Sequence, residues 1–348
     1  MDVEGGGRGP GRQRRPAVMS DVGRLAGVSH QTVSRVINGS PKVRPETRGR
    51  VIAAMRELDY RPNTVARALV TGRTYTLGVV GFDTTLYGPA SVLFGIERAA
   101  HEAGYLMIVA SLKALNRSSV SFAIERLRVQ GVDGILVLAP HLEAADALGH
   151  APVDVPVVAV EAGPVDIVPV VAVDQYKGAV SATRHLLDLG HESVWHISGP
   201  PDWLESRERI EGWRTTLEAA GADAPAPLPG DWSARAGYDH GRRLSADPAV
   251  TAIFAANDQM ALGVIRALHE AGRAIPDEVS VVGFDDIPES PYFMPPLTTV
   301  RQDFIEVGSR SLRLLVRSIE GGGRAPSRSL VEPQLIVRSS TAVALVRR

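Results

Sequence analysis

Residues 28–39, VSHQTVSRVING, place Val33, Val36 and Ile37 at the spacing expected for the inner face of a short helix. The other side chains of this helix are small, amide-bearing or basic, and none of them is acidic. A lone helix of this kind would be interpreted as having a solvated outer face. The segments on either side of it favour a different interpretation.

Two further helices are predicted beside this one. MSDVGRLAG, which precedes it, places Val22, Leu25 and Ala26 on one face, and its final glycine permits a tight turn. Ser29 is suited to cap the second helix, which we expect to run to about Asn38. RVIAAMRELDY, further along, predicts a third amphipathic helix. Two short helices joined by AGVS, with the second polar on its outside, predict a helix-turn-helix.

The second helix carries the side chains that recognition of the DNA major groove requires. That groove is about 12 Å wide, and a slim helix inside it reads base edges with hydrogen-bond donors and acceptors. His30, Gln31 and Arg35 supply such groups, since arginine can pair with guanine and glutamine with adenine. Thr32 and Ser34 are short enough to reach phosphates or bases. The predicted DNA contacts in this segment are Ser29, His30, Gln31, Thr32, Ser34, Arg35 and Asn38.

The charge distribution agrees with a DNA-binding segment near the N-terminus. Residues 1–73 carry 14 Arg and Lys against 6 Asp and Glu, whereas the remainder carries 24 against 33. A basic head on an acidic body indicates that only the head meets a polyanion. Residues 1–17, rich in Gly, Arg and Pro, predict a disordered basic tail, either solvated or lying along phosphates, unless the true start is Met19.

From residue 74 onward, apolar strands alternate with helices that end at glycine. Near-continuous apolar strands in strand–helix–strand order predict a parallel sheet, and the length of the segment predicts two doubly wound lobes. We expect strands within residues 76–82, 105–111, 134–139, 156–161, 170–174, 193–198, 251–257 and 279–285. Helices closed by glycine are expected within residues 96–104, 182–190, 213–221 and 264–272.

Several functional classes are excluded by the sequence. Because it contains no cysteine, it offers no disulfide framework, thiol nucleophile or cysteine-ligated metal, which fits a reducing compartment. No apolar run approaches the roughly 20 residues of a membrane helix, and the N-terminus lacks the apolar core of a signal peptide. His191 and His196 lack the spacing of a zinc-protease helix, and no nucleophile elbow or phosphate-binding loop is present. We therefore expect a cytoplasmic protein that is not an enzyme and needs no cofactor or metal.

Residues 20–74, SDVGRLAGVSHQTVSRVINGSPKVRPETRGRVIAAMRELDYRPNTVARALVTGRT, resemble the DNA-binding headpiece of the LacI/GalR family of transcription regulators. GDWSARAGY, ANDQMALG, VSVVGFDD and PPLTTVRQDF, further along the chain, also match that family. The resemblance implies an α/β protein with a small all-α helix-turn-helix headpiece and a two-lobed, doubly wound sensor domain of the type I periplasmic-binding-protein-like kind. It also implies a homodimer that binds double-stranded operator DNA and a small-molecule effector. The expected segments are the tail 1–17, the headpiece 18–62, a hinge helix 63–73, and an effector-binding and dimerisation domain 74–348.

RPNTVARALVTGR, residues 61–73, is the segment that is expected to form the hinge helix. Asn63 can cap it, but about eight residues are too few to be helical alone in water. The resemblance implies that the helix forms when two hinges pair on operator DNA, where Leu69 wedges into the central minor groove. The alternative is an ordinary linker with one buried leucine.

Polar residues at the carboxyl ends of predicted strands form the candidate effector site. Glu161, Asn257 and Asp285 occupy such ends, where ligands of parallel sheets bind. Carboxylates and amides can each engage two neighbouring hydroxyls of a sugar, and Trp232 offers an aromatic face. The sugar-binding pattern of the family adds Arg209, Gln302 and Phe304. The alternatives are helix capping or strand-end hydrogen bonding for the polar groups, and core packing for the aromatic ones.

The chain departs from the family pattern in ways that affect these expectations. His30 and Glu161 stand where a sugar-binding member of the family carries tyrosine and aspartate, so the base that is read and the size of the effector stay open. Arg44 replaces a serine cap that many relatives carry, and the sequence ends without a leucine-heptad tail, so a dimer is the expected assembly. We expect a repressor released by a sugar or glycoside, for example a galactoside. The alternatives are a purine or sugar-phosphate effector, a sugar-binding protein without a regulatory role, and a sugar-processing enzyme.

Overall fold

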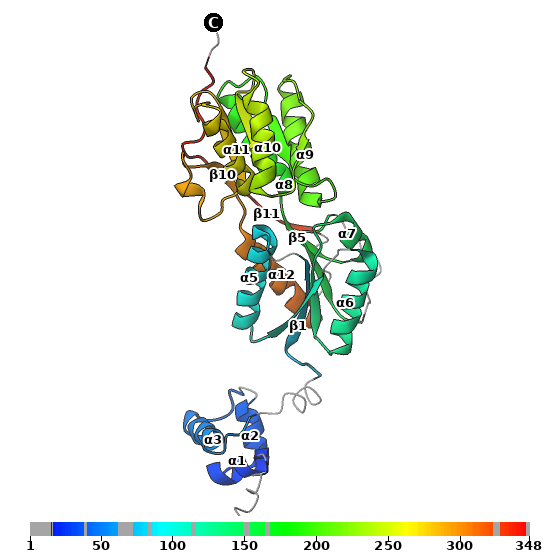
Figure 1. Cartoon of the computed structure of the whole chain (residues 1–348). Helices are drawn as coiled ribbons and strands as arrows, with labels where there is room; N and C mark the ends of the chain where they lie inside the picture. The colour runs from blue at the N-terminus through cyan, green and yellow to red at the C-terminus, as the bar shows by residue number, and fades with distance from the viewer. Residues whose placement is uncertain are drawn as a thin grey trace, which may run out of the picture. The chain divides into compact units, whose positions relative to one another are not determined.

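The computed structural model describes residues 15, 17–37, 40–61, 72–82, 85–112, 116–148, 154–163, 168–322 and 328–345. The chain forms two compact units, Met1–Thr74 and Tyr75–Arg348 (Figure 1). Nearly all of the predicted basic tail, and residues 63–71 of the predicted hinge with Leu69, lie outside the described residues, as does Asn38. The expectations for these positions therefore stay predictions.

The first unit contains the three helices that the sequence predicts, α1 (Met19–Ala26), α2 (His30–Ile37) and α3 (Pro45–Glu57). Gly27 ends α1 with a φ of 66°, and the backbone N–H of Thr32 donates to Ser29 Oγ at 3.3 Å, which caps α2. Arg44, at the start of α3, makes no capping hydrogen bond through its side chain. One small core joins the three helices, and its buried residues are Val22, Ala26, Val33, Val36, Val51 and Ala54.

Leu25 departs from the predicted apolar face of α1, because its side chain is 45% exposed. Val22 and Ala26 lie four positions apart and share the buried face, whereas Leu25 follows Val22 by three and lies at the edge of that face. The first unit is too small to cover a wider stripe of this helix.

Gly49 offers a test of helix stability within α3. An added Cβ would meet no atom within 4 Å, and the residue is exposed in the middle of a helix. Because glycine costs about 0.5–1 kcal/mol relative to alanine at such a position, Gly49→Ala is expected to slow amide hydrogen exchange in α3 about two- to fivefold. Gly23→Ala is the matched control, since its Cβ would lie 2.9 Å from the carbonyl oxygen of Val28. Faster exchange in the Gly49→Ala chain would contradict the prediction.

The second unit consists of two lobes, each built on a six-stranded sheet. The first sheet has the order β11-β5-β4-β3-β1-β2, and all its strands are parallel. The second sheet has the order β12-β10-β9-β8-β6-β7, in which β12 alone runs antiparallel to its neighbour. The strands of the first sheet are β1 (Thr76–Phe82), β2 (Leu106–Leu112), β3 (Gly134–Leu138), β4 (Val157–Val160), β5 (Val170–Val173) and β11 (Arg328–Val331). Those of the second are β6 (Trp195–Ser198), β7 (Leu228–Pro229), β8 (Ala252–Ala255), β9 (Ser280–Asp285), β10 (Thr298–Arg301) and β12 (Gln334–Ile336).

Helices cover both faces of each sheet, so both lobes are doubly wound as predicted. The helices of the first lobe are α5 (Tyr87–Glu102), α6 (Arg117–Val129), α7 (Leu142–Leu148) and α12 (Phe304–Ile319). Those of the second lobe are α8 (Gln175–Asp188), α9 (Leu204–Ala219), α10 (Ala234–Ser245), α11 (Asp258–Glu270) and the single turn η1 (Ser290–Tyr292). The chain crosses between the lobes three times, after β5, after β10 and after β11.

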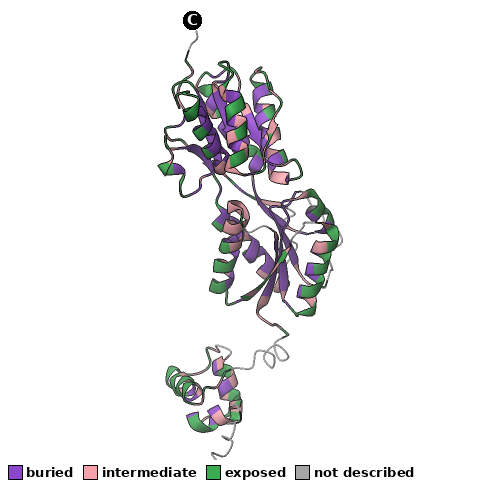
Figure 2. Cartoon of the chain, in the orientation of Figure 1, coloured by how far each residue is buried: buried purple, intermediate pink, exposed green. Residues whose placement is uncertain are grey.

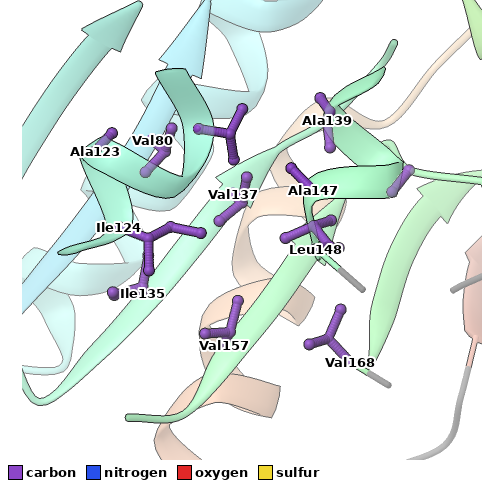
Figure 3. Close-up of a cluster of buried hydrophobic side chains, with 14 of the residues drawn as sticks. Val80, Ala123, Ile124, Ile135, Val137, Ala139, Ala147, Leu148, Val157 and Val168 are labelled. Atoms are coloured by element: carbon purple, nitrogen blue, oxygen red, sulfur yellow. The ribbon is translucent and has the colours of Figure 1, made fainter. Parts of the chain in front are cut away.

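The buried residues lie in layers between the sheets and their helices. Figure 2 shows the strands of both lobes as largely buried, with exposed residues on the outer helix faces. In the first lobe, Ile124 from α6 and Leu148 from α7 meet Ile135 and Val137 of β3 in one cluster (Figure 3). Four layers of this kind fix the strand ends at which the candidate effector residues lie. No helix within the described segments has the length and apolar character needed to cross a membrane.

Candidate functional site

The outer face of α2 presents the predicted DNA-reading side chains. His30, Gln31 and Arg35 are exposed on it, and Thr32 and Ser34 are half-buried beside them. The first turn of this helix contains no acidic residue. Because the N-terminus of a helix carries exposed N–H groups and a partial positive charge, that end is suited to a phosphate. The arrangement is suited to DNA, with a polar helix face next to an anion-binding helix end.

A cavity with an empty volume of about 530 Å³ lies between the two lobes of the second unit. The first lobe lines it with the turn before α5, the start of α5 and Phe304 of α12, and the second lobe lines it from α9, α11 and the ends of strands. Six of the seven predicted effector residues line this cavity, namely Arg209, Trp232, Asn257, Asp285, Gln302 and Phe304. The cavity has the mixed polar and aromatic lining of a small-molecule site.

Glu161 is the predicted effector residue that lies apart from the other six. It lines a smaller neighbouring cavity of about 310 Å³, which shares Phe304 and Glu205 with the larger one. Its carboxylate accepts from the backbone N–H of Val173, with both oxygens at 3.3 Å. Burial, together with the nearby Glu205, raises the pKa of Glu161 well above its usual value. Its surroundings thus favour the uncharged acid.

Three of the predicted residues have unusual backbone geometry. Glu161, Trp232 and Asp285 have φ angles of 53°, 70° and 111°, which lie in the region that favours glycine. Such a conformation costs on the order of 1–3 kcal/mol for a residue with a side chain, and it concentrates at functional sites. The chain therefore carries backbone strain at three positions at or next to the ends of helices or strands, and each of these residues lines a cavity.

Asn257 both caps a helix and lines the cavity. Its Oδ1 accepts from the backbone N–H of Met260 at 2.9 Å, which is the capping role weighed from the sequence as the alternative. Its Nδ2 donates to the carbonyl oxygen of Trp232 at 3.0 Å. This bond ties the start of α11 to the turn before α10. Asn257 therefore fixes the position of Trp232 in the wall of the cavity.

Trp232 similarly combines core packing with a place at the cavity. Its ring meets that of Trp203 edge to face, with centroids 5.5 Å apart, and only 7% of the residue is exposed. Its Nε1 has no hydrogen-bond partner in the part of the chain that the structure describes. On the opposite wall, Tyr87 and Phe304 also meet edge to face at 5.9 Å. Aromatic residues from both lobes therefore line this cavity.

Arg209 supplies the positive charge of the site. It is 2% exposed, and its guanidinium carbon lies 3.9 Å from the centre of the Phe284 ring. Its Nη1 donates to the carbonyl oxygen of Ala256. Its Nη2 lies 3.7 Å from a Glu205 oxygen and 4.0 Å from Asp285 Oδ1. Arg209 is therefore held on an aromatic face with two acids within reach.

Asp285 is an acid whose surroundings favour the protonated form. Gln302 Nε2 donates to its Oδ1 at 2.5 Å. Burial raises the pKa of Asp285 to about 8, and the acids Asp258 and Glu205 add to the shift while Arg209 and Gln302 oppose it. A carboxyl group in this state can donate as well as accept a hydrogen bond. Asp285 therefore has the chemistry to bind a hydroxyl group without carrying a charge.

Asp286, the next residue, lies just beyond the end of β9 with a φ of 53° and does not line the cavity. Its carboxylate pairs with Arg301 Nε at 2.7 Å and with Arg338 Nη2 at 2.6 Å. Asp285 and Asp286 therefore do not form a carboxylate pair. Within the described residues, no group of three or more His, Asp and Glu side chains is arranged to hold a metal ion.

Sequence reasoning missed several residues of the cavity wall. Tyr87 and Trp203 are aromatic, and Glu205 precedes Arg209 by one helical turn. The signals available for them were weak, since Trp203 is one of four tryptophans and Glu205 is one of several acids in its helix. Other lining residues that were not predicted are Thr85, Leu86, Gly88, Pro89 and Gln259.

The chain matches two family models over parts of its length and known proteins over nearly all of it. Residues 18–63 match the model "Bacterial regulatory proteins, lacI family", and residues 183–341 match "Periplasmic binding protein-like domain". The lactose operon repressor of Escherichia coli strain K12 is 32% identical over 333 residues, which cover 95% of this chain and 92% of that protein. A solved structure of the lac repressor dimer bound to operator and the anti-inducer ONPF has a TM-score of 0.83 and 32% identity, and covers 94% of this chain and 100% of that one.

Two other relatives are similar over the same length. The transcriptional regulator CelR of Thermobifida fusca is 37% identical and covers 94% of this chain and 99% of that protein. The solved CelR–cellobiose complex has a TM-score of 0.69 at 34% identity, and covers 93% of this chain and 99% of that one. The transcriptional repressor PurR of Haemophilus influenzae strain Rd is 32% identical and covers 93% of this chain and 98% of that protein.

Proposed function

This chain belongs to the lacI family of bacterial regulatory proteins, and on that premise we propose that it is a repressor released from operator DNA by a neutral sugar or glycoside. The headpiece, residues 18–62, binds the operator, and residues 74–348 bind the effector and form a homodimer. The helix-turn-helix with its polar α2 face supports the first assignment. The cavity between the lobes supports the second.

The observation that carries the effector class is the combination of charge and aromatic faces in the cavity. Asp285 and Glu205 lie beside the single guanidinium of Arg209, and burial raises the pKa of both acids. The protonated carboxyl of Asp285 and the amide of Gln302 supply donors and acceptors for hydroxyl groups. Trp232 offers an apolar ring to the C–H face of a sugar. These groups fit a neutral polyol with one apolar face.

A sugar phosphate fits this cavity poorly. A phosphate dianion would be repelled by Asp285 and Glu205 whenever either acid is ionised. Arg209 alone would have to offset that repulsion. A purine could use the aromatic faces and Arg209, and it is therefore the stronger rival. The ring acceptors of a purine would need protonated carboxyl groups as donors, whereas a sugar hydroxyl can bond to a carboxyl group in either protonation state.

The proposed mechanism follows from the two-lobed lining of the cavity. A ligand that contacts Phe304 of the first lobe and Arg209 of the second binds best when the lobes close around it. A change in the relative orientation of the lobes would alter the spacing of two headpieces in a dimer and so reduce operator affinity. Coupling of this kind is worth about 1–3 kcal/mol in allosteric proteins. We further propose that residues 63–73 form the hinge helix on DNA, with Leu69 wedged between central bases.

The effector class can be tested by calorimetry on the full-length protein with cellobiose, o-nitrophenyl galactoside, a hexose phosphate and hypoxanthine. We expect one of the two glycosides to bind and to weaken operator binding in the same buffer. Tight hypoxanthine binding that strengthens operator binding would overturn the sugar assignment. Trp232→Ala should abolish the glycoside response, whereas Trp195→Ala, on β6 and outside the cavity lining, should keep it.

The DNA assignment predicts a specific loss for one exposed arginine of α2. Arg35→Ala is expected to weaken operator binding by about 1–3 kcal/mol and to relax the preference for one base pair in each half-site. Arg214→Ala is the control, since it removes the same charge from an exposed position of α9 in the other unit. Binding-site selection with both variants measures the base preference. An unchanged preference for Arg35→Ala would refute its role as a base-reading side chain.

Exposed apolar side chains on the first lobe support the proposed homodimer. Leu106 and Val109 of β2 are 69% and 41% exposed at the edge of the sheet, and Phe122 of α6 is 64% exposed. An edge strand with apolar neighbours is a surface that a second copy would cover. Sedimentation at micromolar concentration is expected to show a dimer. Leu106→Arg should shift it toward monomer, while Leu142→Arg on α7 should not, and equal behaviour of the two variants would count against this surface.

A further inference from the structure

Three hydrogen bonds in a row connect Arg209 to Asp285 through a residue that does not line the cavity. Gln175, the first residue of α8, is 2% exposed and is absent from the cavity wall. Arg209 Nε donates to Gln175 Oε1 at 2.9 Å, and Gln175 Nε2 donates to Gln302 Oε1 at 2.8 Å. Gln302 Nε2 donates in turn to Asp285 Oδ1 at 2.5 Å. Arg209 Nη2 and Asp285 Oδ1 lie 4.0 Å apart, which is too far for a direct hydrogen bond. The two amides therefore link these residues by hydrogen bonds.

The guanidinium at one end gives this chain of hydrogen bonds a direction. It only donates hydrogen bonds, so every amide along the chain must accept on the Arg209 side and donate on the Asp285 side. Gln175 must therefore turn its oxygen toward Arg209, which leaves its NH₂ for Gln302. Gln302 must then turn its own NH₂ toward Asp285. The orientation of the amide in the cavity wall thus depends on a buried residue behind it.

We propose that Gln175 is a positioning residue of the effector site, which sets the orientation of the Gln302 amide and so leaves the second oxygen of Asp285 for the effector. This inference rests on the proposed function in one respect, namely that Asp285 and Gln302 contact the effector. The orientation itself does not depend on the identity of the ligand. It can therefore be tested on the ligand-free protein.

Gln175→Glu reverses the chain with almost no change in shape. A carboxylate at position 175 accepts from Arg209 as before but has no proton for Gln302. Gln302 is then expected to rotate, donate to position 175, and turn its oxygen toward Asp285. Two acceptors would face each other unless Asp285 holds a proton. The new carboxylate also adds one charge to the groups around Asp285, which are otherwise Arg209 and Glu205 on α9, Asp258 on α11 and Tyr87 on α5.

The readout is the dependence of stability on pH in the full-length protein. In the unfolded chain Asp285 loses its proton near its usual pKa, whereas in the folded chain it keeps the proton up to a pKa of about 8. Between these two pKa values the folded state binds more protons than the unfolded state, so the melting temperature falls as the pH rises toward about 8. Above that pH Asp285 is ionised in both states and no longer contributes to the pH dependence. For Gln175→Glu we expect the fall to continue to a pH at least one unit higher.

Gln259→Glu is the matched control, because it adds the same charge at the wall of the same cavity but lies outside this chain of hydrogen bonds. Superimposable pH profiles for the two variants would overturn the proposal. The double variant Gln175→Glu/Asp285→Asn adds a second measurement, since an amide at position 285 can donate to the rotated Gln302. At pH 9 it should melt higher than Gln175→Glu alone, and a lower melting temperature would again overturn the proposal.

Calorimetry with cellobiose and o-nitrophenyl galactoside separates this inference from the proposed function. If either glycoside binds the wild-type protein, Gln175→Glu is expected to weaken that binding at least tenfold, and unchanged binding would refute the positioning role. If neither binds the wild-type protein, the sugar assignment fails. In that case the ligand-free pH profiles still decide the role of Gln175.

Discussion

Arg209→Met is expected to remove the effector response and to lower the free energy of unfolding by about 3–5 kcal/mol at pH 9. Methionine keeps much of the length of the side chain, so the change mainly removes charge and hydrogen bonds. Gln175 Oε1 and the carbonyl oxygen of Ala256 would each lose a donor inside the protein. Asp285 and Glu205 would lose the guanidinium that lies beside both of them.

The same variant should cost less at pH 6 than at pH 9. Burial raises the pKa of Asp285 to about 8 and that of Glu205 above its usual value, and Arg209 opposes both shifts. Without Arg209 both acids hold their protons more tightly, so their ionisation at high pH becomes more costly in the folded state. At pH 6 Asp285 is protonated with or without the arginine, so for this acid mainly the lost hydrogen bonds remain. Urea denaturation at the two pH values measures this difference.

Arg207→Met provides the control on the same helix. Its side chain is exposed and its Nε donates to the carbonyl oxygen of Pro201 at 2.9 Å. Because exposed interactions of this kind contribute little, its cost should be below about 1 kcal/mol at either pH. A cost for Arg209→Met that matches this control would show that the buried guanidinium does not hold the site together.

The helices that sequence analysis placed correctly carry local signals at their ends. The four predicted helices of the second unit that stop at glycine correspond to α5, α8, α9 and α11. The glycines that follow them, Gly104, Gly190, Gly221 and Gly272, have φ angles of 75°, 87°, 68° and 70°. A left-handed residue after a helix is a property of a few neighbouring residues, so the sequence alone reveals it. The eight predicted strands are also present, and they too were recognised from a local signal, namely a run of apolar residues.

The elements that were missed depend on distant parts of the chain. β11 contains Arg328 and pairs with β5, whose residues lie more than 150 positions earlier. β7, β10 and β12 are only two to four residues long, so they show no apolar run. The unpredicted α12 begins where the chain returns from the second lobe to the first. The crossing itself depends on the whole fold, although α12 carries local helix signals, namely the N-cap Asp303 and a buried apolar face.

The candidate site shows the same division. Asn257 and Asp285 could be proposed because they end apolar strands, and the family pattern supplied Arg209. Gln175 is the first residue of α8, directly after the capping Asp174, so its position in the sequence suggests no role in the site. Only the fold brings it between Arg209 and Gln302. Residues that line the cavity are therefore partly readable from sequence. Residues that orient them from behind are not.

Gly263→Ala is expected to lower the free energy of unfolding of the second unit by more than about 3 kcal/mol, because the new methyl group would strike another helix backbone. Gly263 lies on α11, and an added Cβ would lie 2.0 Å from the carbonyl oxygen of Ala234 and 2.5 Å from the backbone nitrogen of Tyr238. Ala234 and Tyr238 belong to α10, which runs beside α11 (Figure 1). A flexible side chain could move aside, but a helix backbone can yield only if the two helices separate.

Separation of α10 from α11 would also reach the effector cavity. Asn257 caps α11, and its Nδ2 donates to the carbonyl oxygen of Trp232, which lies just before α10. When the helices move apart this bond is lost, and Trp232 moves relative to Asn257. We therefore expect Gly263→Ala to weaken glycoside binding while the headpiece, which is a separate unit, keeps its affinity for operator half-sites. Gly81→Ala is the control, because its Cβ would meet no atom within 4 Å although the residue is buried in β1. If the two variants unfold at the same urea concentration, α10 and α11 tolerate a methyl group between them, and the close approach of their backbones does not hold the second lobe together.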